Sequence, residues 1–293
     1  MHKLVGMKEH SNSVPKNNFG IPTRSIRLGK TLQFFSKNLA ATLVAKLFIT
    51  PIRHKTPERE EMMRESAKGE MVLIPSLGYE VMVYTYGYSK TKVLLAHGWS
   101  GRGTQMYAVA DKILENGMMI ISFDAPAHGL SKGKTTTPTE FIKTIEFLNS
   151  TYGPFEAAVG HSFGSISLLK SVSNGLKLNK LVVIGTEFTI TNIIENLIEN
   201  LQLKSSIVNK LKKKLDQKYK GDIEFYSAAN SAKNVTIPTL VLHDTNDKNV
   251  DVSSAYKLRQ NLSNGELLVT SGLGHQNILR DENIINRIIE FIK

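Results

Sequence analysis

The 293-residue chain contains no cysteine, so it has neither a disulfide framework nor a thiolate metal site. It also lacks a secretory signal pattern, because no apolar core follows the first basic residues and no small-residue cleavage site is present. We therefore expect a cytoplasmic protein. There is no internal repeat or low-complexity tract, and 41% hydrophobic with 22% charged residues is the composition of an ordinary globular protein.

Acidic residues are scarce near the N-terminus. Residues 1–70 contain 13 Lys and Arg against 6 Asp and Glu, whereas residues 71–293 contain 24 against 20. Much of the net charge of +11 therefore lies outside the main body of the chain, which argues against a nucleic-acid-binding enzyme. An anionic surface remains a candidate partner for the N-terminal segment.

A long apolar run is also missing. Residues 1–29 are polar and basic and predict a loosely ordered arm. Residues 30–50 have apolar side chains at helical spacing, but Lys37 and Lys46 interrupt them and Pro51 follows, so they are not a spanning helix. The favoured interpretation is an amphipathic helix packed on the domain or over the mouth of its active site.

The alternative for this segment is weak contact with a membrane surface through residues 30–59. In that interpretation the helix lies at the interface, and Arg53, Lys55 and Arg59 supply basic neighbours. We divide the chain into residues 1–70, an N-terminal arm with this helix, and residues 71–293, the main domain.

From Met71 onward, short apolar runs alternate with helical patterns. The first two runs, 71–75 and 80–86, predict a hairpin around Leu77 and Gly78. Further strands are expected at 93–96, 118–123, 157–160, 181–184, 240–242 and 267–269, and helices at 104–116, 139–150, 254–262 and 282–292. The pattern predicts an α/β fold, with a mainly parallel central sheet flanked by helices and a binding site at the carboxyl ends of the strands.

One segment breaks the alternation. Residues 188–233 contain no convincing strand but carry apolar residues in helical register, including Leu197 and Leu211. We expect a small helical lid inserted between two strands. Its lysine run at 210–214 is interpreted as a solvated helix face.

The segment Gly160-His161-Ser162-Phe163-Gly164 stands between an apolar run and an amphipathic helical pattern. A strand, a sharp turn and a helix would hold Ser162 in a strained, open position beside the positive end of the helix dipole. This segment resembles the Gly-x-Ser-x-Gly nucleophile elbow of the α/β-hydrolase superfamily. The resemblance covers residues 71–293 and implies that Ser162 is the nucleophile, with neighbouring His161 pointing away from the site.

The same resemblance implies a base and an acid later in the chain, in the order serine, acid, histidine. His275, in a glycine-containing loop after the last strand, takes the position of the base. Asp247, three residues before Val250 in the loop after the preceding strand, takes that of the acid. His243 stands where the family usually has glycine, and Asp244, Asp251 and Glu187 remain rival acids.

Two further loops resemble the family. The run Ala96-His97-Gly98-Trp99 is similar to its oxyanion loop, which implies that the backbone N–H groups of Trp99 and Phe163 form the oxyanion hole. The run from Asp124 to Ser131 is similar to a loop with a structural role. A metal site at Asp124 and His128 is disfavoured because a third and fourth ligand are lacking.

These resemblances predict a serine hydrolase that cleaves a small acyl compound, most simply a carboxylic ester, through a Ser162–His275–Asp247 triad and an acyl-enzyme. No cofactor and no metal are needed. Thioester, amide or carbon–carbon bond cleavage and perhydrolysis would use the same groups, and a non-catalytic ligand-binding or membrane-associated member of the fold is the competing class. The sequence leaves the oligomeric state and the natural substrate open.

Overall fold

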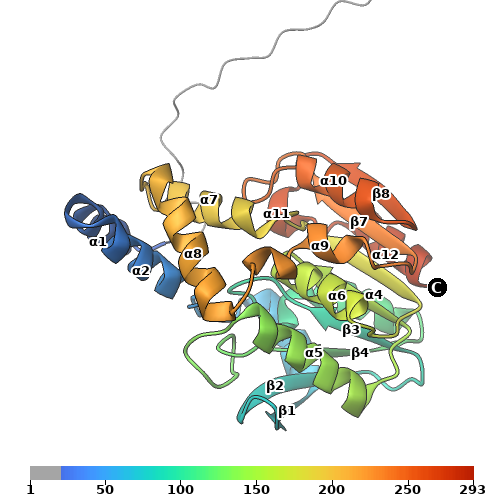
Figure 1. Cartoon of the computed structure of the whole chain (residues 1–293). Helices are drawn as coiled ribbons and strands as arrows, with labels where there is room; N and C mark the ends of the chain where they lie inside the picture. Colours follow the sequence, from blue (N-terminus) through green and yellow to red (C-terminus); the bar gives the residue numbers. More distant parts are fainter. Residues whose placement is uncertain (1–20) are drawn as a thin grey trace, which may run out of the picture.

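The computed structural model describes residues 21–293, so the first twenty residues of the predicted arm lie outside the described residues. Eight strands form one sheet in the order β1-β2-β4-β3-β5-β6-β7-β8 (Figure 1). The strands are β1 (Lys68–Ile74), β2 (Tyr79–Tyr86), β3 (Lys92–Ala96), β4 (Met119–Phe123), β5 (Ala157–His161), β6 (Lys180–Ile184), β7 (Thr239–Asp244) and β8 (Gly265–Thr270).

The sheet is antiparallel at one edge and parallel elsewhere. The predicted hairpin is confirmed: β1 and β2 pair antiparallel, with Met71 opposite Met82, and Gly78 takes the positive φ of 75° that their turn requires. Strand β2 also pairs antiparallel with β4. From β4 through β3, β5, β6 and β7 to β8, all pairs are parallel, as the alternation of short apolar runs and helices predicted.

Helices cover both faces of the sheet. One layer contains α5 (Pro138–Tyr152), α6 (Phe163–Ser173), α9 (Ala228–Ala232) and α10 (Ser253–Asn261), and the other contains α3 (Glu61–Ser66), α4 (Tyr107–Glu115) and α12 (Glu282–Ile292). Alternate residues of a strand enter different cores: Leu94 of β3 packs in the first cluster and Leu95 in the second. The sheet is thus held between two apolar layers.

A helical insertion separates β6 from β7. It contains α7 (Ile190–Asn200), α8 (Val208–Tyr219) and α9, joined by short 3₁₀ turns, and it has no strand, as predicted for residues 188–233. Glu224, in the turn η4 (Ile223–Tyr226), accepts the backbone N–H groups of Ile190 and Thr191 and so fixes the start of α7. A third apolar cluster joins this insertion to the N-terminal helices.

The single helix predicted for residues 30–50 is wrong: two helices, α1 (Thr23–Phe35) and α2 (Lys37–Phe48), meet at Ser36. Ser36 is extended, with φ −158° and ψ 122°, and its hydroxyl accepts the backbone N–H groups of Asn38 and Leu39. Serine favours such a cap because its oxygen satisfies donors that the first helical turn leaves open. The apolar spacing continues across this break and therefore conceals it. No helix among residues 21–293 combines the length and the apolarity needed to cross a bilayer.

Residues 49–57 belong to no helix or strand and run from α2 across two loops at the carboxyl edge of the sheet. The backbone N–H of Ile52 donates to the Ser100 hydroxyl at 3.0 Å. Arg53, considered above as a basic neighbour at a membrane, instead donates to the carbonyl oxygens of Ala127, Ser131 and Gly133. The guanidinium of Arg53 therefore holds a loop of the main domain.

The short helix η1 (Glu58–Glu60) continues this attachment. Glu60 is buried, and its carboxylate accepts hydrogen bonds from Arg102 at 3.0 Å and from the Thr104 hydroxyl at 2.8 Å. The Arg102 side chain is only 11% exposed, so this ion pair is largely shielded from water. Residues before β1 are thereby bound to the loop that follows β3.

Candidate active site

Ser162 stands at the sharp turn between β5 and α6. Its φ of 52° and ψ of −114° are strained for a residue with a Cβ atom. A Cβ atom at Gly164 would lie 2.1 Å from the carbonyl oxygen of Ala96, and one at Gly160 would lie 2.7 Å from the backbone of Ser165. Glycine on both sides lets the helix approach the sheet closely enough to form the turn. The Ser162 N–H donates to the Ile184 carbonyl at 2.8 Å, which fixes the turn beside β6.

Asp247 and His275 meet although they follow different strands. The Nδ1 atom of His275 lies 2.6 Å from Oδ2 of Asp247, whose side chain is 2% exposed. The other carboxylate oxygen accepts the backbone N–H groups of Asn249 and Val250. Burial alone would raise the pKa of Asp247, but the hydrogen bond and charge of His275 and the two backbone donors hold that pKa below its usual value.

An ionised Asp247 fixes the tautomer of the histidine. A carboxylate can only accept, so Nδ1 of His275 donates to Asp247, and in the neutral form of the ring the lone pair is on Nε2. A neutral imidazole in this orientation can take a proton from a hydroxyl and later return it.

The rival acids make other contacts. Asp244, the last residue of β7, accepts the backbone N–H groups of Asn246, Leu273 and Gly274 and the hydroxyl of Thr270. It therefore holds the loop that carries His275 without bonding to the imidazole.

Asp251 and Glu187 serve local structure as well. The Asp251 carboxylate accepts the N–H of Ser253, while Glu187 accepts bonds from Asn192 and Ser254. Among residues 21–293, the carboxylate hydrogen-bonded to the His275 ring is Asp247.

The expectation that His161 points away from the site is wrong, because its side chain contacts His275. Its Nε2 lies 2.9 Å from the carbonyl oxygen of His275, and the two rings are 4.6 Å apart between centroids. Burial and the nearby His275 lower the pKa of His161 to about 3, so the ring is neutral and donates one N–H to that carbonyl. As the last residue of β5, His161 reaches the same sheet edge as the loop after β8, a proximity that sequence spacing does not reveal.

Gly185, the residue that follows β6, lies between the turn at Ser162 and the ring of His275. A Cβ atom at Gly185 would lie 3.1 Å from both Cε1 and Nδ1 of His275 and 3.6 Å from Oδ2 of Asp247. The preceding residue, Ile184, binds the N–H of Ser162. The structure thus brings the predicted nucleophile, base and acid to the carboxyl ends of neighbouring strands β5, β6, β7 and β8.

The predicted oxyanion residues lie against each other. A Cβ atom at Gly98 would stand 3.1 Å from Cβ of Ser162, so the loop after β3 passes directly beside the serine. The ring of Trp99 packs edge to face on that of Phe163, with centroids 5.4 Å apart. Phe163 begins α6, where backbone N–H groups have no partner within the helix. The structure thus brings the loop that carries Trp99 and the start of α6 together at Ser162.

The loop after β4 has the structural contacts expected of it. Buried Asp124 accepts the backbone N–H groups of Gly103 and Leu130, and His97 accepts the N–H of Ala125 through Nε2. Burial lowers the pKa of His128 to about 4, so that ring is neutral. Within residues 21–293, no group of three His, Asp or Glu side chains gathers closely enough to hold a metal ion.

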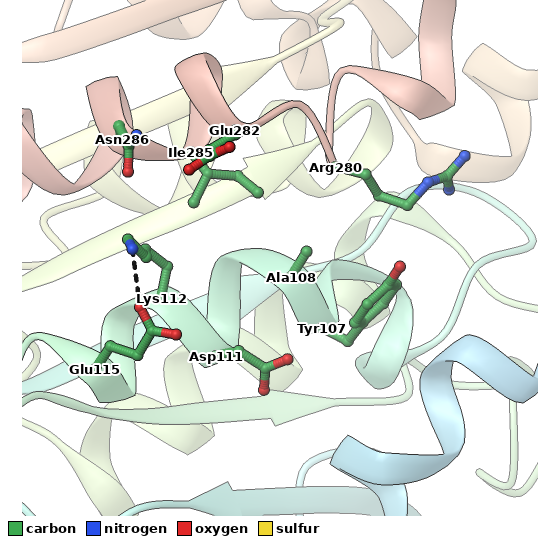
Figure 2. Close-up of a pocket in the computed structure, with 9 residues that line it drawn as sticks. All are labelled: Tyr107, Ala108, Asp111, Lys112, Glu115, Arg280, Glu282, Ile285 and Asn286. Atoms are coloured by element: carbon green, nitrogen blue, oxygen red, sulfur yellow. Dashed lines mark ion pairs between the residues drawn. The ribbon is translucent and has the colours of Figure 1, made fainter.

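Two surface cavities lie away from the candidate active site. One, of about 230 Å³, lies between α4 and α12 and is rimmed by charged side chains, including the Lys112–Glu115 ion pair (Figure 2). The other, of about 480 Å³, lies where α8 meets η4. Neither is lined by Ser162, Asp247 or His275.

Sequence comparison finds similarity to known hydrolases. The family model Abhydrolase_4, described as TAP-like protein, matches residues 224–292, a range that includes Asp247 and His275. The chain is 24% identical over 227 residues to a monoglyceride lipase homolog of monkeypox virus, covering 64% of this chain and 82% of the relative.

Solved structures share the fold at low sequence identity. The esterase Pf2001 of Pyrococcus furiosus superposes with a TM-score of 0.65 at 17% identity, covering 83% of this chain and 98% of that protein. The mouse α/β hydrolase domain-containing protein 10 superposes with a TM-score of 0.59 at 15% identity, covering 77% and 97%. With its mainly parallel eight-stranded sheet and flanking helices, the chain has the fold of these α/β hydrolases.

Proposed function

We propose that the protein hydrolyses carboxylic esters, with Ser162 as nucleophile, His275 as base and Asp247 as the orienting acid. The observation that carries the proposal is the 2.6 Å contact between Asp247 and His275, in a loop that also contacts His161, the neighbour of the strained Ser162. The lipase and esterase names of the similar proteins support the same class of reaction.

In the proposed reaction, the Ser162 hydroxyl oxygen attacks the ester carbonyl carbon while Nε2 of His275 takes the hydroxyl proton. The carbonyl oxygen becomes an oxyanion, which the N–H groups of Trp99 and Phe163 stabilise. The carbon–oxygen bond to the alcohol breaks as His275 gives its proton to the departing oxygen. An acyl-serine remains, and a water deprotonated by His275 then releases the acid and restores the hydroxyl.

Asp247 contributes through charge. When His275 takes the proton, its ring becomes a cation in contact with a carboxylate that is already ionised. This attraction exists in the transition state and is weaker while the ring is neutral, so it lowers the barrier.

The name of the viral relative suggests a monoacylglycerol as one substrate to try, and the insertion that contains α7 and α8 is the proposed lid over an apolar acyl pocket. The same groups would cleave a thioester or an amide, because both have an acyl carbon open to attack. A panel of p-nitrophenyl esters, acyl thioesters, anilides and monoacylglycerols would rank these substrates.

A fluorophosphonate probe tests the chemistry directly. We expect covalent labelling of the wild-type protein and its loss in Ser162→Ala, with Ser165→Ala of α6 as a serine control that keeps labelling. Labelling that survives in Ser162→Ala, or its absence from folded wild-type protein, would exclude Ser162 as the nucleophile. It would leave a non-catalytic ligand-binding role.

A further inference from the structure

The junction of α1 and α2 presents a pair of aromatic rings to solvent. Phe34 is 85% exposed and Phe35 is 76% exposed, and their rings stand edge to face with centroids 5.3 Å apart. Leu28 and Leu39 are about half exposed on the same two helices. Large apolar side chains grouped in this way on a surface mark an interaction site more often than isolated ones do.

The rest of this helical pair is packed on the protein. Ile26, Ala40, Ala41 and Val44 are buried in the cluster shared with α7 and α8. The break at Ser36, which the serine hydroxyl stabilises, allows α1 to fold back along α2 and brings Phe34 and Phe35 to the turn. Figure 1 shows α1 and α2 projecting beyond α8 at one end of the molecule. The rings are therefore carried at the end of a firmly attached element.

The charged residues of the helical pair itself are of one sign. Residues 21–50 contain Arg24, Arg27, Lys30, Lys37 and Lys46 and no Asp or Glu. All five of these residues are exposed to solvent. Helix α8, which packs on α2, adds an exposed lysine at 213.

From these observations we propose that the helical pair docks on an anionic lipid surface, with Phe34 and Phe35 inserted at the level of the headgroups and the surrounding Lys and Arg on the lipid phosphates. Amphipathic elements with aromatic residues and a basic rim bind such surfaces through apolar burial and electrostatic attraction together. A second copy of the chain fits less well, because a symmetric contact would place two cationic rims against each other.

Docking at this place would bring the candidate active site to the lipid. The segment after α2 binds the loop that carries Trp99 through Ile52 and Ser100, and α2 packs on the insertion that follows β6. The helical pair thus lies over the carboxyl edge of the sheet. The docking proposal itself does not require the proposed ester hydrolysis, because binding is measured without turnover.

The test uses the full chain and vesicles of phosphatidylcholine with or without 30% phosphatidylglycerol. We expect partitioning into the anionic vesicles that falls as salt rises, since exposed charges are screened. Phe34→Ser with Phe35→Ser should lower the partition coefficient by about fivefold for each ring, taking partial burial of a phenyl group as the basis. Because both rings are exposed, this variant should keep its fold. Tyr88→Ser, at a fully exposed residue between β2 and β3, is the matched control and should bind as wild type.

Charge provides a second and independent variant. Arg27→Gln with Lys37→Gln should lower binding by about fivefold for each charge at low salt, whereas Lys90→Gln with Lys177→Gln, also at exposed sites, should not.

Two outcomes overturn the proposal. One is equal binding by the Phe34/Phe35 variant and the Tyr88 control. The other is a wild-type dimer in light scattering that the Phe34/Phe35 variant converts to a monomer, which would identify the rings as a contact between copies of the chain.

Discussion

Two aspartates three residues apart allow the acid assignment to be tested in one experiment. Asp247→Asn removes the charge in contact with His275, and Asp244→Asn removes a charge that holds the His275 loop without touching the ring. Both substitutions preserve shape. If Asp247 is the acid, the first should lower turnover severely and the second should mainly lower stability.

The size of the first effect follows from the geometry. In the transition state the imidazolium and the carboxylate are roughly 4 Å apart between charge centres, and such a pair at an effective dielectric constant of 20 gains about 4 kcal/mol. Losing that gain lowers kcat by about three orders of magnitude. An asparagine at 247 can also donate to Nδ1 and stabilise the wrong tautomer of His275, which acts in the same direction.

Asp244→Asn should mainly lower the free energy of unfolding and should affect turnover less than Asp247→Asn. Asp244 binds three backbone N–H groups and one hydroxyl, and an asparagine would leave at least one of the N–H donors without an acceptor. An orphaned buried donor costs about 1–3 kcal/mol of unfolding free energy. We expect less than tenfold loss of kcat for Asp244→Asn.

The assay is hydrolysis of p-nitrophenyl butyrate at pH 7.5, with urea unfolding of the same preparations. A larger loss of turnover in Asp244→Asn than in Asp247→Asn would refute the assignment. So would an Asp247→Asn variant that keeps more than a tenth of wild-type turnover.

Two further predictions concern the packing around this site. Gly185→Ala should lower kcat by about 10- to 100-fold, because its Cβ atom would lie 3.1 Å from the His275 ring and small displacements of catalytic groups are costly. Gly117→Ala, at a similar positive φ with no atom within 4 Å of the added Cβ, should show only the backbone cost and keep wild-type kcat; equal losses in both would contradict the argument. Stability should also fall with acid, because burial holds the pKa of His128 at about 4 and of His161 at about 3, below the unfolded value near 6.5. Each buried neutral histidine stabilises the fold fully above pH 6.5, and by pH 5 each has lost about 2 kcal/mol of that contribution; equal unfolding free energies at pH 7.5 and pH 5 would contradict this.

Much of the fold could be predicted from the sequence because its signals are local. The alternation in residues 71–86 fixes a hairpin, and Gly160 and Gly164 around Ser162 specify a turn that other residues cannot form. Short apolar runs between helical patterns gave the parallel sheet, since only a strand buried on both faces is apolar throughout.

What the sequence did not reveal depends on contacts between distant segments. Apolar spacing runs through Ser36, so the break between α1 and α2 is visible only in the structure, in the extended backbone and the side-chain hydrogen bonds of Ser36. The contact of His161 with His275 joins residues 114 apart, and Arg53 finds its partners 74 to 80 residues later. The spacing of residues along one sequence does not predict such long-range contacts.

The attachment of segment 49–60 has a practical consequence for work on residues 71–293 alone. A chain shortened to begin at Met71 would lose Arg53 and Glu60, leaving three carbonyl oxygens without their donor and the Arg102 guanidinium unpaired in a nearly dry site. Removing one partner of a buried ion pair alone costs about 3–5 kcal/mol, a large share of the stability of a typical domain. The part of the chain that resembles known hydrolases is thus shorter than the part that must be expressed together. Deletion experiments need to retain residues 49–60 as well as residues 71–293.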